Sequence, residues 1–160
     1  MASGRVLASV ACVLAVVLAA RATQVSVCPD KGSRQLTSEE VNIVGCNKPP
    51  CKLKKKTTVE LEVKFTADED VESVRNGVYA NIVGIPFPFI GVDGKPACPD
   101  IFNEDGSPAQ CPLKAGSKYL YKGSFKVLDI YPRIRVDVVW ALKSAKEKNL
   151  FCFRVPVRIY

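Results

Sequence analysis

The stretch FCFRVPVRI at residues 151–159 alternates apolar with charged or small side chains, and this period of two predicts a β-strand. Successive side chains of a strand point to opposite sides of the sheet, so one face of this segment would be buried and the other exposed. The shared buried face would hold Phe151, Phe153, Val155, Val157 and Ile159, opposite Arg154 and Arg158.

Two other segments, residues 57–66 and 133–142, alternate in the same way. Their apolar faces would comprise Val59, Leu61, Val63 and Phe65 in the first, and Ile134, Val136, Val138, Trp140 and Leu142 in the second. Weaker alternation predicts three more strands at 39–44, 77–85 and 118–127. Turns rich in Gly, Pro, Asn and Asp separate them, at 47–50, 92–96 and 103–108. Six or seven short strands between such turns predict an all-β, immunoglobulin-like sandwich of two antiparallel sheets.

The first 22 residues have the composition of a secretory signal peptide. Arg5 precedes an uncharged apolar run at 6–20, and Ala20-Arg21-Ala22 has the small residues that signal peptidase requires. We expect cleavage near Ala22–Thr23 and one domain at 23–160; the alternative is an uncleaved anchor, for which the run is short.

Without Arg5 and Arg21 the net charge of +7 becomes +5, which favours anionic partners such as phospholipid head groups. No pattern of basic and aromatic residues indicates binding to nucleic acid.

Seven cysteines occur, of which Cys12 lies in the predicted leader. An even number in a short secreted chain predicts three disulfides, with fifteen pairings open to the six that remain: Cys28, Cys46, Cys51, Cys98, Cys111 and Cys152. The alternative is a zinc site, but the chain has no His and lacks two closely spaced Cys pairs. We therefore expect no metal.

Catalytic machinery is not evident. The absence of His excludes Ser-His-Asp and Cys-His arrangements, and no glycine-rich phosphate loop occurs, so we expect neither an enzyme nor a cofactor. The unusual feature is IPFPFI at 85–90, an apolar run whose two prolines exclude a central strand. Such a run either closes a cavity, meets a partner, or folds onto the core.

The chain resembles the Niemann–Pick type C2 proteins, within the MD-2-related lipid-recognition (ML) domain family. The resemblance covers nearly all of residues 23–160 and rests on several strings in one order. These are VNIVGC at 41–46, PCKL at 50–53, GIPFPF at 84–89, CPLKAG at 111–116, YLY at 119–121, YPRI at 131–134, VVW at 138–140 and CFRVPV at 152–157. It implies an immunoglobulin-like sandwich with a hydrophobic cavity between the sheets and the disulfides Cys28–Cys152, Cys46–Cys51 and Cys98–Cys111.

The resemblance also implies a ligand site. Its entrance would match Phe89, Val127 and Tyr131, flanked by Phe87, Pro88 and Pro132. Deeper lining would come from inward-facing positions, each of which has ordinary core packing as its alternative: Val59, Leu61, Val63, Val78, Ile82, Val136, Val138 and Trp140. The interval between Cys98 and Cys111 is longer than expected and would reshape the mouth.

The resemblance implies a carrier of a sterol, fatty acid or similar small lipid. It would work in the extracellular fluid or in the lumen of the endosome or lysosome. The alternative is an immune recognition protein that binds microbial lipids and presents them to a membrane receptor. The basic run at 52–56 would touch anionic membranes, or would simply be a solvated strand end.

Overall fold

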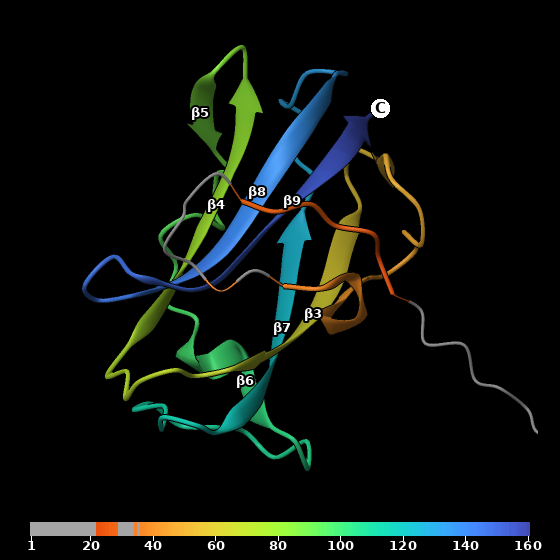
Figure 1. The fold of residues 1–160 in the computed structure, drawn as a ribbon. Helices are drawn as coiled ribbons and strands as arrows, with labels where there is room; N and C mark the ends of the chain where they lie inside the picture. The colour runs from red at the N-terminus through yellow and green to blue at the C-terminus, as the bar shows by residue number, and fades with distance from the viewer. Residues whose placement is uncertain (1–21, 29–33, 35) are drawn as a thin grey trace, which may run out of the picture.

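The structure is a computed structural model that describes residues 22–28, 34 and 36–160, and it contains two β-sheets in two layers (Figure 1). One sheet has the strand order β1-β3-β7-β6, and the other has the order β2-β9-β8-β4-β5. The bounds in the first are β1 Val41–Ile43, β3 Thr58–Thr66, β7 Lys118–Lys126 and β6 Ile101–Asn103. Those in the second are β2 Cys51–Leu53, β9 Asn149–Ile159, β8 Arg135–Ser144, β4 Val74–Ile82 and β5 Ile85–Pro88.

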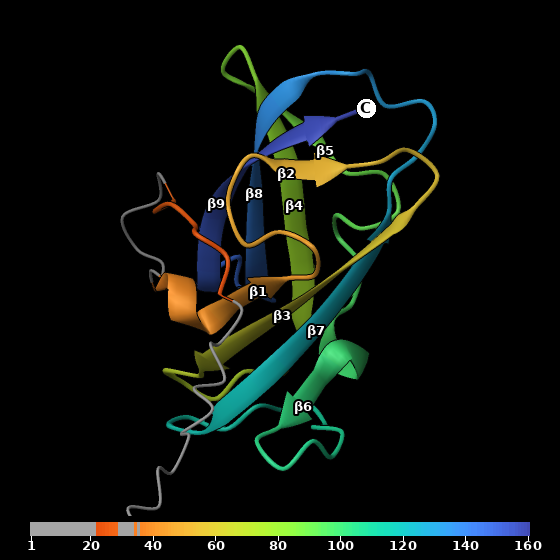
Figure 2. The same cartoon turned by 90° about the vertical axis from the view of Figure 1, so that its right-hand side faces the viewer.

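The strands predicted from alternation are confirmed as β3, β4, β7, β8 and β9, with ends that differ by a few residues. At 39–44 only β1 is extended. A short 3-10 helix, η1 (Ser38–Glu40), precedes it, because the Thr37 backbone N–H donates to the Glu40 carboxylate at 2.7 Å. The short strands β2, β5 and β6 and the short helix η2 (Cys98–Asp100) were not predicted. In Figure 2, β3 and β7 run diagonally across β4, β8 and β9, which belong to the other layer.

The first four residues of the proline-containing run at 85–90 form β5, which pairs only with β4 and lies at the edge of its sheet. This position agrees with the prediction that the run is not a central strand, because Pro86 and Pro88 have no N–H to donate to a further neighbour. Among the described strands only β2 and β9 pair in parallel. No helix in the described part of the chain is long and apolar enough to cross a membrane.

All three expected disulfides are present: Cys28–Cys152, Cys46–Cys51 and Cys98–Cys111. The first attaches an N-terminal strap, residues 23–28, to β9. There the Ser26 N–H donates to the Arg154 carbonyl at 2.7 Å, and the Arg154 N–H donates to the Ser26 carbonyl at 2.9 Å. The strap explains why β8 is apolar on both faces in its middle, since Val139 and Ala141 pack in a second cluster with Cys28.

Aromatic side chains fill most of the space between the sheets, around Tyr121, Trp140 and Phe151. The Tyr121 hydroxyl donates to Asn76 Oδ1 at 2.9 Å, which satisfies two polar groups inside the core. Burial, and then the nearby Asp100 carboxylate, raise the pKa of the Tyr121 phenol well above its ordinary value. Most of the predicted leader, residues 1–21, lies outside the described residues, and Thr23, which follows the predicted cleavage site, is fully buried.

Candidate functional site

An apolar cavity of about 320 Å³, the mouth cavity, lies at one end of the sandwich, where the β4–β5 hairpin meets the start of β8 and the end of β9. Figure 1 shows this hairpin at the same end of the molecule as the C-terminus. Phe87, Pro88, Ile90 and Pro132 are exposed at its rim, so the cavity is open to the outside. It is lined by Ala80, Ile82, Phe87, Pro88, Phe89, Ile90, Tyr131, Pro132, Ile134, Val136 and Ile159.

Phe89 closes the inner end of the mouth cavity. Its side chain is only 5% exposed, and its ring lies edge-on to two others, with centroids 5.7 Å from Phe125 and 5.3 Å from Tyr131. Its backbone N–H donates to the Val78 carbonyl at 2.9 Å, while the Val78 N–H donates to the Asp93 carboxylate at 2.7 Å. These bonds hold the loop after β5 against β4, and so position the Phe89 ring.

A second, much smaller space, the inner cavity, lies between the sheets and measures about 20 Å³. That volume is close to what one water molecule needs, but the lining offers no polar surface to hold one. Phe125 belongs to this lining, and Phe89 belongs to the mouth cavity, so the contact of their rings separates the two spaces. The inner cavity is lined by Ile43, Cys51, Leu53, Val59, Leu61, Phe125, Val138, Trp140, Phe153, Val155 and Val157.

The predicted site residues fall into three groups. The mouth cavity brings together Phe87, Pro88, Phe89, Tyr131, Pro132, Ile82 and Val136. The inner cavity includes Val59, Leu61, Val138 and Trp140. The remaining three, Val63, Val78 and Val127, are buried in the core and line neither space. The hydrophobic cavity expected between the sheets is therefore nearly closed in this structure, and most of the open volume lies at its entrance.

Several lining residues were not named from the sequence, although the same alternation that predicted the strands could have found some of them. Ile134, Phe153, Val155, Val157 and Ile159 stood on the predicted buried faces. By contrast, Ile43 and Leu53 reach the inner cavity because β1 and β2 join different sheets, and no local pattern contains that information.

Tyr131 is the one side chain of the mouth lining that carries a polar group. Burial raises the pKa of the Tyr131 phenol above its ordinary value. The hydroxyl therefore stays neutral at physiological pH. An uncharged, almost wholly apolar cavity suits a hydrophobic ligand. No group of three or more His, Cys, Asp or Glu side chains in the described residues is placed to hold a metal ion.

Positive charges lie beside the mouth cavity. Lys52 of β2, Arg158 of β9 and Arg135 of β8 are neighbours across three strands on the exposed face of the sheet, and together form a basic row. Farther along the predicted basic run, Lys55 Nζ donates to the Asp129 carbonyl at 2.7 Å, and Lys56 Nζ lies 3.3 Å from the Asp129 carboxylate. Since Asp129 precedes the mouth residue Tyr131 by two positions, the run at 52–56 flanks the mouth.

A larger recess of about 400 Å³ lies at the far end of β3 and the start of β7. Its walls carry paired charges, with Arg34 Nη2 2.9 Å from the Glu40 carboxylate and Lys118 Nζ 4.0 Å from the Glu104 carboxylate. Much of its surface is polar, so it does not suit a hydrophobic ligand despite its size.

A two-layer β-sandwich with an apolar cavity open at one end has the architecture of a lipid-recognition domain. The family model described as "ML domain" matches residues 22–159. The chain therefore belongs to the ML-domain family. It is 32% identical over 157 residues to "NPC intracellular cholesterol transporter 2" of Mus musculus, covering 97% of this chain and 98% of that one.

Other comparisons agree. The chain is 34% identical over 135 residues to "Ecdysteroid-regulated 16 kDa protein" of Manduca sexta, covering 82% of this chain and 86% of the relative. The solved structure of a Niemann–Pick type C2 protein from Japanese carpenter ant aligns with a TM-score of 0.65 at 24% identity, over 82% of this chain and 97% of that one, and shows the same fold. Family membership supports the expectation that the chain is not an enzyme.

Proposed function

We propose that this chain is a carrier that takes up a small lipid, a sterol or a fatty acid, through the mouth cavity and releases it at a membrane. The mouth cavity carries the proposal, because its lining is apolar, it opens outward, and it points toward a second apolar space. The relatives named for cholesterol transport support a sterol as the first ligand to test.

The free energy available to such a complex comes from burial of apolar surface. Removing about 400 Å² of apolar ligand surface from water at ~25 cal/mol per Å² contributes on the order of 10 kcal/mol before entropic costs. The mouth cavity alone is at the lower end of ligand-pocket volumes, about 300–1,000 Å³. A ligand of sterol size therefore requires the Phe89 ring to move away from Phe125. That movement would join the mouth cavity to the inner cavity.

Exposed apolar side chains around the mouth support release at a membrane. Val83, at the tip of the β4–β5 hairpin, is 97% exposed, and Ile130 is 73% exposed. Val83 also has a φ of +52°, a left-handed conformation that β-branched residues rarely adopt. A strained and fully exposed apolar side chain does not stabilise the folded state. This combination at Val83 therefore favours a role in contact with a partner.

The basic row supports an anionic membrane as that partner. Like charges directly opposite one another on adjacent strands destabilise a sheet, and no ion pair between a described carboxylate and any of Lys52, Arg158 and Arg135 is present. Phosphate head groups would neutralise the row while the Val83 tip enters the lipid layer. The same basic residues beside the mouth favour a second candidate function, recognition of anionic microbial lipids for presentation to a receptor.

Secretion after removal of residues 1–22 is part of the proposal. The full burial of Thr23 supports a domain that begins there, because the fold uses this residue. N-terminal sequencing of the protein recovered from expressing cells should start at or just before Thr23. A start beyond Thr23, or a retained apolar leader, would contradict this boundary.

Organic extraction of the protein purified from eukaryotic culture medium, followed by mass spectrometry, tests the proposed function. We expect a sterol or fatty acid at up to one molecule per chain, and uptake of added cholesterol by the delipidated protein. Tight binding of bacterial lipid together with a stable receptor complex would favour recognition instead. Failure to retain or take up any lipid would refute both.

A further inference from the structure

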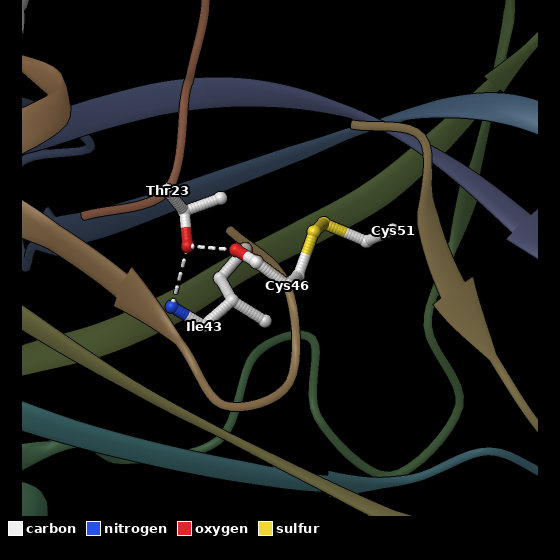
Figure 3. The surroundings of a disulfide bond; sticks show 4 residues. All are labelled: Thr23, Ile43, Cys46 and Cys51. Carbon is white, nitrogen blue, oxygen red and sulfur yellow. Dashed lines mark hydrogen bonds between the residues drawn. A yellow bond between two sulfur atoms is a disulfide. The ribbon is translucent and has the colours of Figure 1, made fainter. Parts of the chain in front are cut away.

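The side chain of Thr23 holds the turn that follows β1, next to the inner-cavity residue Ile43. Its hydroxyl donates to the Cys46 carbonyl at 2.6 Å and accepts from the Ile43 N–H at 2.9 Å (Figure 3). The Thr23 backbone N–H adds a bond of 2.8 Å to the Val41 carbonyl. Thr23 is fully buried, so water does not compete for these bonds.

The residues held by Thr23 belong to the connection between the sheets. β1 lies in one sheet and β2 in the other, and the loop between them carries the Cys46–Cys51 disulfide. Ile43, at the end of β1, and Cys51, at the start of β2, both line the inner cavity. Thr23 therefore fixes the end of β1 and the turn after it, while the Cys46–Cys51 disulfide and the pairing of Ser26 with Arg154 of β9 tie this region to the other sheet.

The opposite side of the interior is held less firmly. There Phe89 meets its neighbours Phe125 and Tyr131 through ring contacts, and no disulfide or buried hydrogen bond joins these three side chains. Ring contacts can separate without leaving an unsatisfied polar group, whereas breaking the Thr23 bonds would leave a buried N–H and a buried carbonyl unpaired. The sandwich is thus built to open at Phe89 while the β1–β2 side stays in place.

We propose that Thr23 is a positioning residue of the lipid site: it holds the Ile43–Cys51 wall fixed, so that the inner cavity widens only from the Phe89 side and grips the slim end of a long ligand. This inference rests on the proposed lipid-binding function. It predicts that Thr23 controls affinity for ligands that reach the inner cavity and leaves ligands confined to the mouth cavity unaffected.

The test compares Thr23→Val, which keeps the side-chain volume but removes the hydroxyl, with Thr23→Ser, which retains the hydroxyl. Palmitate and octanoate serve as the long and short probes. For Thr23→Val we expect about tenfold weaker palmitate binding, because the wall loses its preorganisation, with octanoate binding unchanged. Thr23→Ser should restore palmitate binding. Thr57→Val is the matched control, since the Thr57 hydroxyl also donates to a carbonyl, that of Lys54, but at an exposed site.

Equal losses for both probes, or no loss for either, would overturn the positioning role while the wild-type chain still bound lipid. A wild-type chain that bound neither probe would instead refute the proposed function together with this inference.

Hydrogen exchange of the wild-type chain provides a measurement that does not depend on the folding of Thr23→Val. On palmitate uptake the Ile43 amide, which donates to Thr23, should keep its exchange rate, while the amides of the Phe89–Val92 loop should change by severalfold. A change at Ile43 as large as that at Phe89 would show that the wall moves with the ligand, and would contradict the proposal.

Discussion

The ring of Phe89 meets the ring of Phe125 at a centroid distance of 5.7 Å and an interplanar angle of 84°, and this contact separates the mouth cavity from the inner cavity. Phe89 comes from the loop after β5, at the edge of one sheet, and Phe125 comes from β7 of the other sheet. Their separation would join the two apolar spaces.

The replacement Phe89→Ala should weaken cholesterol binding by about tenfold. The ligand loses its contact with the aromatic ring, which contributes on the order of 1.4 kcal/mol to the binding free energy. The unfolding free energy should fall by about 3 kcal/mol, the low end for a buried Phe, since the ring already borders open space. Ligand titration and urea unfolding measure the two effects. Phe102→Ala, which removes a half-buried ring that stacks with Lys122, is the matched control and should leave binding unchanged. Unaltered affinity in Phe89→Ala would remove Phe89 from the site.

Replacement Val83→Asn should make the isolated protein more stable and its membrane contact weaker. Asn tolerates the left-handed conformation that strains Val, so the unfolding free energy should rise by up to about 1 kcal/mol. Loss of the apolar tip should reduce affinity for phosphatidylserine vesicles by about tenfold. Thermal unfolding and vesicle co-sedimentation measure these effects. If vesicle affinity is unchanged while stability rises, the hairpin tip does not enter the membrane.

Replacement Arg158→Gln tests the basic row. Each basic residue near an anionic surface contributes about 1 kcal/mol, so vesicle affinity should fall by about fivefold at low salt. The difference from wild type should shrink as salt screens the surface charge. Lys146→Gln, an exposed change in the turn between β8 and β9, serves as the control. Equal losses from Arg158→Gln and Lys146→Gln would mean that net charge, rather than the row, attracts the membrane.

Stability at alkaline pH should depend on Tyr121. Its pKa is raised in the folded state, so the stabilisation it provides is complete below the ordinary tyrosine pKa of about 10 and is lost as the pH rises further. Tyr121→Phe leaves Asn76 without its partner and should cost about 1–3 kcal/mol at pH 8. The difference in unfolding free energy between wild type and Tyr121→Phe should narrow above pH 10. A constant difference up to pH 11 would show that the Tyr121 phenol does not titrate differently in the two states.

The long strands were predictable because one buried face imposes an alternation that is visible in the sequence, as in β3 and β9. The short strands were not, because three residues carry no period: β2 is defined by its parallel pairing with β9, and β6 by its pairing with β7. Alternation also misses the second apolar face of β8. Val139 and Ala141 are buried there by the N-terminal strap, which comes from the other end of the chain.

The sequence indicated in part which residues gather at the mouth cavity, although Val127, which was expected among them, is buried in the core. Phe87, Phe89 and Tyr131 stood in strings shared with a known family, and they meet at the mouth cavity. Inward-facing positions deeper in the sandwich could not be sorted from the sequence, since Val63, which is core, and Leu61, which lines the inner cavity, occupy the same face of β3. The difference depends on which side chains stand opposite, and that is a property of the packed sheets.

Trp140 is the only tryptophan in the chain and lines the inner cavity, so its fluorescence reports directly whether a lipid passes between the sheets. Titration of the delipidated protein with a fatty acid brominated near its methyl end should quench Trp140 saturably, at one molecule per chain, while the unbrominated acid should bind without that quenching. Binding of the brominated acid with Trp140 emission unchanged would show that the lipid stays outside the sandwich, and would contradict a carrier that opens at Phe89.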